Sequence, residues 1–131
     1  MEEKIQRVKE ILTKAQGITV LTGAGISAES GIPTFRGDDG LWKKYRPEDI
    51  DTTDAFMRNP TYVWQWYDDL RALISKTKPN LGHYALAEIE KLKPNFTVIT
   101  QNIDDLHRAA GNTNIIELHG NIWRARCIQC P

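Results

Sequence analysis

The sequence predicts an α/β fold in which helices flank a parallel sheet. Three short apolar runs, at 18–22, 96–100 and 115–118, have the length and β-branched content of buried strands. Helical periodicity lies between the runs, and strands that alternate with helices form parallel sheets. The first run enters a glycine-rich loop at 23–28 whose G-x-G-x-x-A pattern is typical of dinucleotide-binding turns. A Rossmann-like parallel sheet with flanking helices is therefore expected.

Residues 3 to 16 are predicted to form an amphipathic helix, because apolar residues recur at spacings of three and four. Gly17 is a plausible helix stop. Residues 38 to 58 have weak periodicity, so we expect an irregular excursion with short helical pieces. The apolar face of the first helix would consist of Ile5, Val8, Leu12 and Ala15.

Two further helices are predicted between the first two strands. Asn59 and Pro60 fit the N-cap and first position of one helix, and the other spans about 81–92. Asn102 is expected to cap a short helix that Gly111 closes. The apolar faces would consist of Val63, Trp66, Tyr67, Leu70 and Ile74 in the first, and Leu81, Ala85, Ile89 and Leu92 in the second.

Composition limits the classes of partner. The chain of 131 residues is long enough for one modest domain, and its 17 Lys and Arg balance its 17 Asp and Glu. We therefore expect no direct nucleic-acid binding. The charged N-terminus lacks a secretory signal, and no apolar run approaches the roughly 20 residues that cross a bilayer. A cytoplasmic protein without a membrane partner is expected.

Polar residues follow each predicted strand. Residues 23–27 follow the first, 101–104 the second, and His119 the third. Ligands bind at the carboxyl ends of parallel strands, so we expect one cleft that holds all three segments. Simpler explanations exist for each segment, because the glycine loop could be a plain turn, Asn102 and Asp104 could be helix caps, and His119 a satisfied loop residue. His83 and His107 are assigned to structure.

The motifs resemble those of a known family. The glycine loop, followed by Pro33-Thr34-Phe35-Arg36-Gly37, closely resembles the first signature of the sirtuins, the NAD-dependent protein-lysine deacylases. Residues 100–107 resemble the second signature, and 117–120 resemble the motif of the catalytic histidine. Cys127-x-x-Cys130 resembles the first half of the family's zinc ribbon. The motifs occur in family order from about residue 4 to the last residue.

The resemblance implies a site for NAD. Phe35 would shield the reactive ribose face, and Arg36 would position the cofactor near its phosphates. The pyrophosphate would lie in the loop formed by Gly23, Ala24, Gly25, Ile26 and Ser27.

The resemblance also implies the catalytic residues. Gln101 and Asn102 would hold the nicotinamide ribose, and Ile103 and Asp104 would bind the carboxamide. His119 would be the general base, so His119 and Asn102 are the implied catalytic residues. The implied substrate is an acyl-lysine protein or peptide, and the products are lysine, nicotinamide and O-acyl-ADP-ribose. Two alternatives stay open, an inactive nucleotide-binding fragment and an NAD glycohydrolase or ADP-ribosyltransferase.

By the same resemblance, residues 1–131 would be the N-terminal part of a sirtuin-type catalytic domain. About 1–120 would be an incomplete Rossmann portion, and 121–131 the start of a small zinc-binding module. A structural zinc site needs four ligands, whereas Cys127 and Cys130 supply two. They could bind zinc across a dimer or stay free. We expect this chain alone not to bind the whole cofactor.

The resemblance also bears on the acyl group. Family members that prefer succinyl or malonyl groups carry a Tyr-x-x-Arg pair, and the matching positions here are Tyr67 and Leu70. Arg71 lies one place later, about 100° around the helix. A neutral acyl group such as acetyl is therefore expected.

Overall fold

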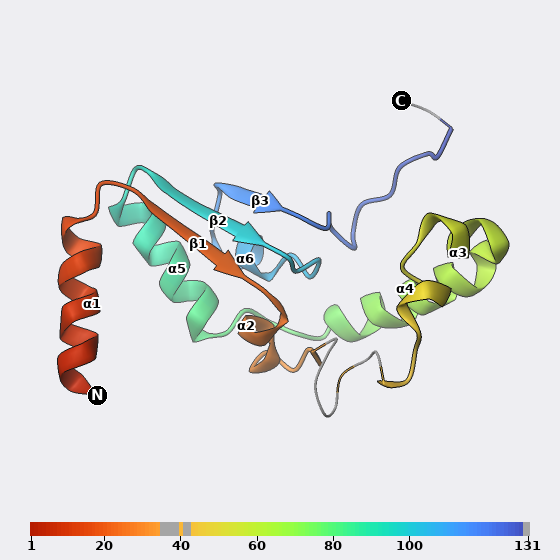
Figure 1. Cartoon of the computed structure of the whole chain (residues 1–131), viewed down its shortest axis with the longest axis horizontal. Helices are drawn as coiled ribbons and strands as arrows, with labels where there is room; N and C mark the ends of the chain where they lie inside the picture. Colours follow the sequence, from red (N-terminus) through yellow and green to blue (C-terminus); the bar gives the residue numbers. More distant parts are fainter. Residues whose placement is uncertain (35–39, 41–42, 130–131) are drawn as a thin grey trace.

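The computed structural model describes residues 1–34, 40 and 43–129. Its centre is a parallel sheet of β1 (Ile18–Thr22), β2 (Phe96–Thr100) and β3 (Ile115–Glu117), in the order β1-β2-β3 (Figure 1). The first two strands have the predicted bounds, and the third ends one residue earlier than predicted. The predicted parallel α/β fold is confirmed. None of the described helices has the length and apolar character that crossing a bilayer requires.

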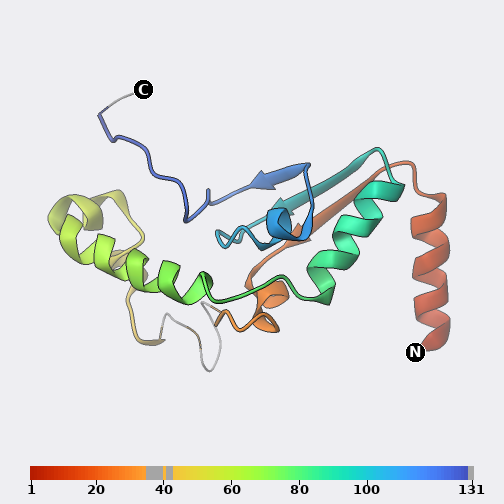
Figure 2. The same ribbon diagram turned by 180° about the vertical axis from the view of Figure 1, so that it is seen from behind.

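The strands end in register. Thr22 lies opposite Thr100, and Thr100 lies opposite Glu117 on its other side. Side chains alternate between the faces of a strand, and β2 buries Phe96, Val98 and Thr100 on one face. Figure 2 shows α5 (Leu81–Leu92) and α6 (Leu106–Ala110) on the near side of the sheet. The three segments that leave the strands therefore start at one edge.

The first helix, α1 (Glu2–Lys14), ends two residues before the predicted bound and stands beside the sheet (Figure 1). Lys93 Nζ donates to Thr13 O and Ala15 O, at 2.7 and 2.9 Å, and so fastens the end of the helix to the segment before β2. The rest of the described chain buries no residue of α1. The apolar face predicted for this helix is therefore present, but nothing in the described structure covers it.

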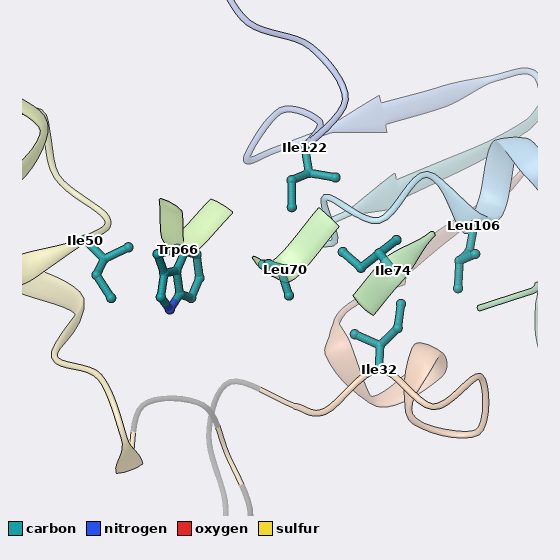
Figure 3. Packing of buried hydrophobic residues seen from close by; sticks show 7 residues of the cluster. All are labelled: Ile32, Ile50, Trp66, Leu70, Ile74, Leu106 and Ile122. Carbon is teal, nitrogen blue, oxygen red and sulfur yellow. The ribbon is translucent and has the colours of Figure 1, made fainter. Parts of the chain in front are cut away.

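A helical lobe lies away from the sheet (Figure 1). Its main element is α4 (Pro60–Ile74), which Asn59 caps as predicted, with Oδ1 accepting from Tyr62 N at 3.1 Å. The preceding excursion contains the expected short pieces, η2 (Pro47–Asp49) and α3 (Thr53–Arg58). A hydrophobic core packs the lobe against the segment after α2 (Ala24–Ala28), against α6 and against the loop after β3 (Figure 3). Its buried residues are Ile32, Ile50, Trp66, Leu70, Ile74, Leu106 and Ile122.

Helix α5 has the predicted bounds, but its predicted buried face is wrong. Leu81 and Leu92 are 84% and 78% exposed, whereas His83 and Ala87 are buried. The imidazole tolerates burial because Asn80 N–H donates to its Nδ1 at 3.3 Å, in a capping box at the start of the helix. Polar tertiary contacts therefore select the inward face of this helix.

The predicted cap at Asn102 is also wrong. The short helix after β2, α6, begins at Leu106 with Asp105 at its N-cap, and Asp104 Oδ1 accepts from Leu106 N at 2.9 Å. Gly111 closes α6 as predicted, with a φ of 112° that favours glycine. Asn102 is thereby left for a different contact, described below.

The turn between α6 and β3 is fixed by a carboxylate of α5. Glu90 accepts hydrogen bonds from Asn112, Thr113 and Asn114. Burial alone would raise the pKa of Glu90, but these hydrogen bonds lower it to about 2. The charged Glu90 therefore sets where β3 begins.

Candidate functional site

The ends of the three strands line one cleft of about 910 Å³. Ala24 and Gly25 come from the segment after β1, Gln101, Asn102 and Ile103 from the segment after β2, and His119 from the segment after β3. The cleft expected from the sequence is thus present, and these six residues line it. The opposite wall belongs to the helical lobe and is largely aromatic, with Phe56, Trp64, Trp66 and Tyr67.

The glycine loop lines the cleft with Ala24 and Gly25. Gly23 occupies the N-cap of α2 (Ala24–Ala28) in an extended conformation. Apart from its chain neighbours and the backbone of its own helix, none of the described residues has an atom within 4 Å of where a Cβ at Gly25 would lie, so they leave open space there. Ile26 points elsewhere, since its side chain lies 3.5 Å from the Cβ position of Gly82 and its carbonyl accepts from Asn80 Nδ2 at 2.7 Å. Ile26 therefore anchors the loop to α5 and does not line the cleft.

Ser27 and Asp104 support the cleft from behind. Both are buried, and Ser27 Oγ donates to Asp104 Oδ2 at 2.7 Å. Ser27 Oγ also accepts from Asn102 Nδ2 at 3.0 Å. This buried hydroxyl therefore joins the segment after β1 to the segment after β2, and it orients the amide of Asn102, which lines the cleft.

The imidazole of His83 contributes to this network. Because Asn80 N–H donates to Nδ1, the hydrogen of the neutral ring lies on Nε2, which is 3.5 Å from Ser27 Oγ. Burial lowers the pKa of His83, and the adjacent His107 lowers it further, while Asp104 opposes the shift. His83 is thus held neutral behind the site.

His107 joins the strand ends. Its Nε2 lies 2.9 Å from Thr22 Oγ1, and Thr22 Oγ1 is 2.9 Å from Thr100 Oγ1. Thr100 Oγ1 in turn accepts from Asn102 N at 3.0 Å. Burial lowers the pKa of His107, which favours the neutral ring, and Asp104 opposes the shift. His83 and His107 are structural, as expected, but their contact with the site residues was not predicted from the sequence.

One ring nitrogen of His119 has a backbone partner. Its Nδ1 lies 3.0 Å from Gln101 O, and because a carbonyl only accepts, Nδ1 carries the hydrogen. The neutral ring then has a free lone pair on Nε2, to which none of the described residues bonds. His119 is exposed at the cleft, in contrast to the two buried histidines.

Two polar side chains of α4, those of Tyr67 and Arg71, also line the cleft. Tyr67 donates to Asp51 Oδ1 at 3.2 Å, and burial, together with the charge of Asp51, raises the pKa of Tyr67 to about 12. Arg71 pairs with Asp68 at 2.5 Å, donates to Ile122 O and lies 5.3 Å from the centre of the Trp64 ring. The guanidinium of Arg71 is therefore already paired.

Three residues implied by the resemblance, Phe35, Arg36 and Cys130, lie outside the described residues. Cys127 is described and exposed. Within the described residues, no group of three or more His, Cys, Asp or Glu side chains could hold a metal ion. The zinc site stays a prediction.

A parallel sheet with a glycine turn and a polar cleft at its carboxyl edge is typical of nucleotide-binding α/β proteins. Residues 23–131 match the model described as the Sir2 family, so the chain belongs to that family. The resemblance to sirtuins is thereby confirmed.

Curated relatives agree with this assignment. The "NAD-dependent protein deacylase 1" of Caldanaerobacter subterraneus subsp. tengcongensis is 61% identical over 123 residues, which are 94% of this chain and 51% of the relative. The "NAD-dependent protein deacylase" of Pyrococcus abyssi is 56% identical over 126 residues, 96% of this chain and 50% of the relative. The chain thus spans about half the length of these relatives.

Solved structures agree as well. A Sir2 homolog–NAD complex is 45% identical, with a TM-score of 0.85 over 95% of this chain and 49% of that chain. A Sir2 protein with a deacetylated p53 peptide and 3′-O-acetyl ADP ribose is 39% identical, with a TM-score of 0.83 over 90% of this chain and 48% of that chain.

The two buried imidazoles make stability depend on pH. Burial lowers the pKa of His83 and of His107 below the ordinary value of 6.5, so the unfolded chain binds more protons just below that pH. The free energy of unfolding should therefore fall as the pH decreases from about 7.5 to about 5, by at most about 1.4 kcal/mol per pH unit for each ring. Urea unfolding at several pH values measures the slope. His83→Gln and His107→Gln should each flatten it, and His119→Gln, which removes an exposed ring, should not. An equal slope in all three variants would contradict this origin.

Proposed function

We propose that this chain forms the nicotinamide side of the active site of an NAD-dependent protein-lysine deacylase. The observation that carries the proposal is the cleft at the strand ends, where His119 Nδ1–H is held by Gln101 O and Nε2 is left free. The names of the relatives support the same activity. In this proposal residues 1–120 are the Rossmann portion, and 121–131 begin a zinc ribbon.

The residues of the cleft fit NAD. The open space at Gly25 leaves room for a phosphate group, which would lie at the start of α2. A relative that is 45% identical is solved as an NAD complex. Bound NAD would supply an electrophilic anomeric carbon with nicotinamide as leaving group. Phe35 and Arg36, assigned by resemblance, would complete the wall beside the loop.

His119 acts as the general base of the proposed reaction. Its free Nε2 takes a proton from a ribose hydroxyl, and Gln101 O stabilises the resulting imidazolium through Nδ1–H. The amide of Asn102, fixed by Ser27, orients the ribose. Ile103 lines the wall where the carboxamide would bind, with the buried carboxylate of Asp104 behind it.

The acyl-lysine would enter between the strand ends and the aromatic wall. A related structure with a deacetylated peptide supports a peptide substrate. Leu70 is buried in the core, and Arg71 forms an ion pair with Asp68. Helix α4 therefore offers no unpaired cation that could bind an acidic acyl group. We therefore favour a neutral acyl group such as acetyl. Cys127 and Cys130 would supply two thiolates to a structural zinc outside the reaction.

The activity is best tested on a chimera. This chain would be joined to the part of the Caldanaerobacter relative that lies outside the match, and mixed with NAD and an acetyl-lysine peptide. We expect peptide-dependent release of nicotinamide. His119→Ala should lower kcat by about 100- to 10,000-fold, because a general base is lost, and should leave NAD affinity largely intact.

The complete relative serves as the positive control for the assay. Release of nicotinamide without peptide would instead favour a glycohydrolase, and no release would favour an inactive nucleotide-binding module. Loss of NAD affinity in His119→Ala would make the histidine structural.

Acyl preference can be shifted through Arg71. Asp68→Asn removes the carboxylate that pairs with Arg71, and the freed charge should raise the ratio of desuccinylation to deacetylation by about 2- to 5-fold, the range of an exposed ion pair. The ratio of the two kcat/KM values in the chimera measures this. Asp69→Asn is the matched control, because Asp69 accepts only from Gln65 among the described residues. An equal change in both variants would refute selection through Arg71.

A further inference from the structure

The loops that follow β2 and β3 are paired along their length. At one end, Leu118 N donates to Thr100 O at 2.9 Å. At the other end, Ile122 N donates to Ile103 O at 2.9 Å, and Trp123 Nε1 lies 3.5 Å from Asp104 O. His119 lies between these ties. The wall at 101–104 and the loop that carries His119 are thus fastened to each other.

The span between the two backbone hydrogen bonds is held mainly by side chains. Gly120 has a φ of 77°, a conformation that other residues rarely adopt, and its N–H reaches Glu117 O only at 3.4 Å. Two side chains fasten this span to its surroundings: His119 through Nδ1 to Gln101 O, and Asn121 through its amide. The orientation of His119 therefore depends on what holds Asn121.

Asn121 uses every hydrogen of its amide. Its Nδ2 donates to Glu117 Oε1 and to Asp105 Oδ1, each at 2.8 Å, and its Oδ1 accepts from Trp123 N at 3.0 Å. Glu117 ends β3, and Asp105 precedes α6. One neutral side chain thus bridges two elements on either side of the loop that carries His119.

The charges around this bridge favour a neutral amide over a carboxylate at position 121. Arg108 lies 3.3 Å from Asp105 and 3.7 Å from Glu117, and Arg124 pairs with Glu117. Two guanidinium groups therefore balance two carboxylates, and a third carboxylate would be unbalanced. Asp105 also has a φ of 68°, a left-handed conformation uncommon outside glycine, so its contacts must hold a strained backbone in place.

We propose that Asn121 is a positioning residue for His119. Its amide clamps Glu117 to Asp105, and thereby keeps His119 Nδ1–H on Gln101 O with Nε2 toward the cleft. The catalytic part of this inference rests on the proposed function, in which His119 is the base. The geometric part concerns this chain alone and is measured without any reaction.

The first experiment determines the tautomer of His119 by long-range proton–nitrogen NMR of the chain. The wild type should show the Nδ1–H form. Asn121→Asp is nearly isosteric, but it replaces the bridging donor with a third carboxylate, so the Nε2–H form should rise to a comparable population. Asn121→Ala removes the bridge without adding charge and should cause a smaller shift in the same direction.

The matched control is Asn114→Asp. Asn114 Nδ2 also donates twice, to Phe96 O at 2.7 Å and Thr97 Oγ1 at 2.9 Å, but it lies before β3, at the opposite end of the strand. This variant should leave the tautomer of His119 unchanged. Retention of the Nδ1–H form in folded Asn121→Asp would overturn the proposal. If that variant does not fold, retention in Asn121→Ala would overturn it equally.

The second experiment uses the chimera described above. Asn121→Asp should lower kcat by about 10- to 100-fold, the size expected when a catalytic group is misplaced, with KM for NAD changed by less than about threefold. A rise in KM with unchanged kcat would contradict positioning of the base. An inactive wild-type chimera with the expected NMR result would count against the proposed function alone.

Discussion

The constraint on which the site depends is the common register of three parallel strands. Thr22, Thr100 and Glu117 lie in one row across the sheet, so segments that are 78 residues apart begin side by side. The hydrogen bond between the hydroxyls of Thr22 and Thr100 fixes this row from its buried face. A slip of one residue would reverse the faces of a strand and expose these hydroxyls, and the cleft would lose its shape.

Behind the cleft, the buried hydroxyl of Ser27 is satisfied by hydrogen bonds, since burial of unpaired polar groups is costly. Ser27 has a donor in Asn102 and an acceptor in Asp104, and the neutral imidazole of His83 reaches the same hydroxyl. His107 extends the contacts to the strand ends. The cleft wall is thus supported by hydrogen bonds that span β1, β2 and α5, whereas His119 is exposed and its Nε2 has no partner among the described residues. The position of His119 is set by its hydrogen bond to Gln101 O and by the backbone hydrogen bonds between the loops after β2 and β3.

Sequence patterns predicted the elements better than their contacts. The strands, α4 and the cleft follow from β-branched runs, caps and the position of polar residues after strands. Helical periodicity does not predict the inward face of α5, because the contacts of buried His83 with Asn80 and Ser27 lie outside that pattern. Local patterns suggest a helix cap at Asn102 and do not contain its hydrogen bond to Ser27, which lies 75 residues away. The bridging contacts of Asn121 cannot be predicted from the sequence, since Asp105 and Glu117 come together only in the fold. The roles of Phe35, Arg36 and Cys130 stay predictions.

The central claim is that three strand ends form one site for the nicotinamide half of NAD. A crystal structure of the chimera with NAD tests it most directly. We expect the nicotinamide ribose between Asn102 and His119, with a ribose hydroxyl about 2.6–3.2 Å from Nε2 of His119. The pyrophosphate should lie against the backbone of Gly23 to Ser27. A ribose bound away from His119, with the phosphates elsewhere than the glycine turn, would contradict a single site at the strand ends.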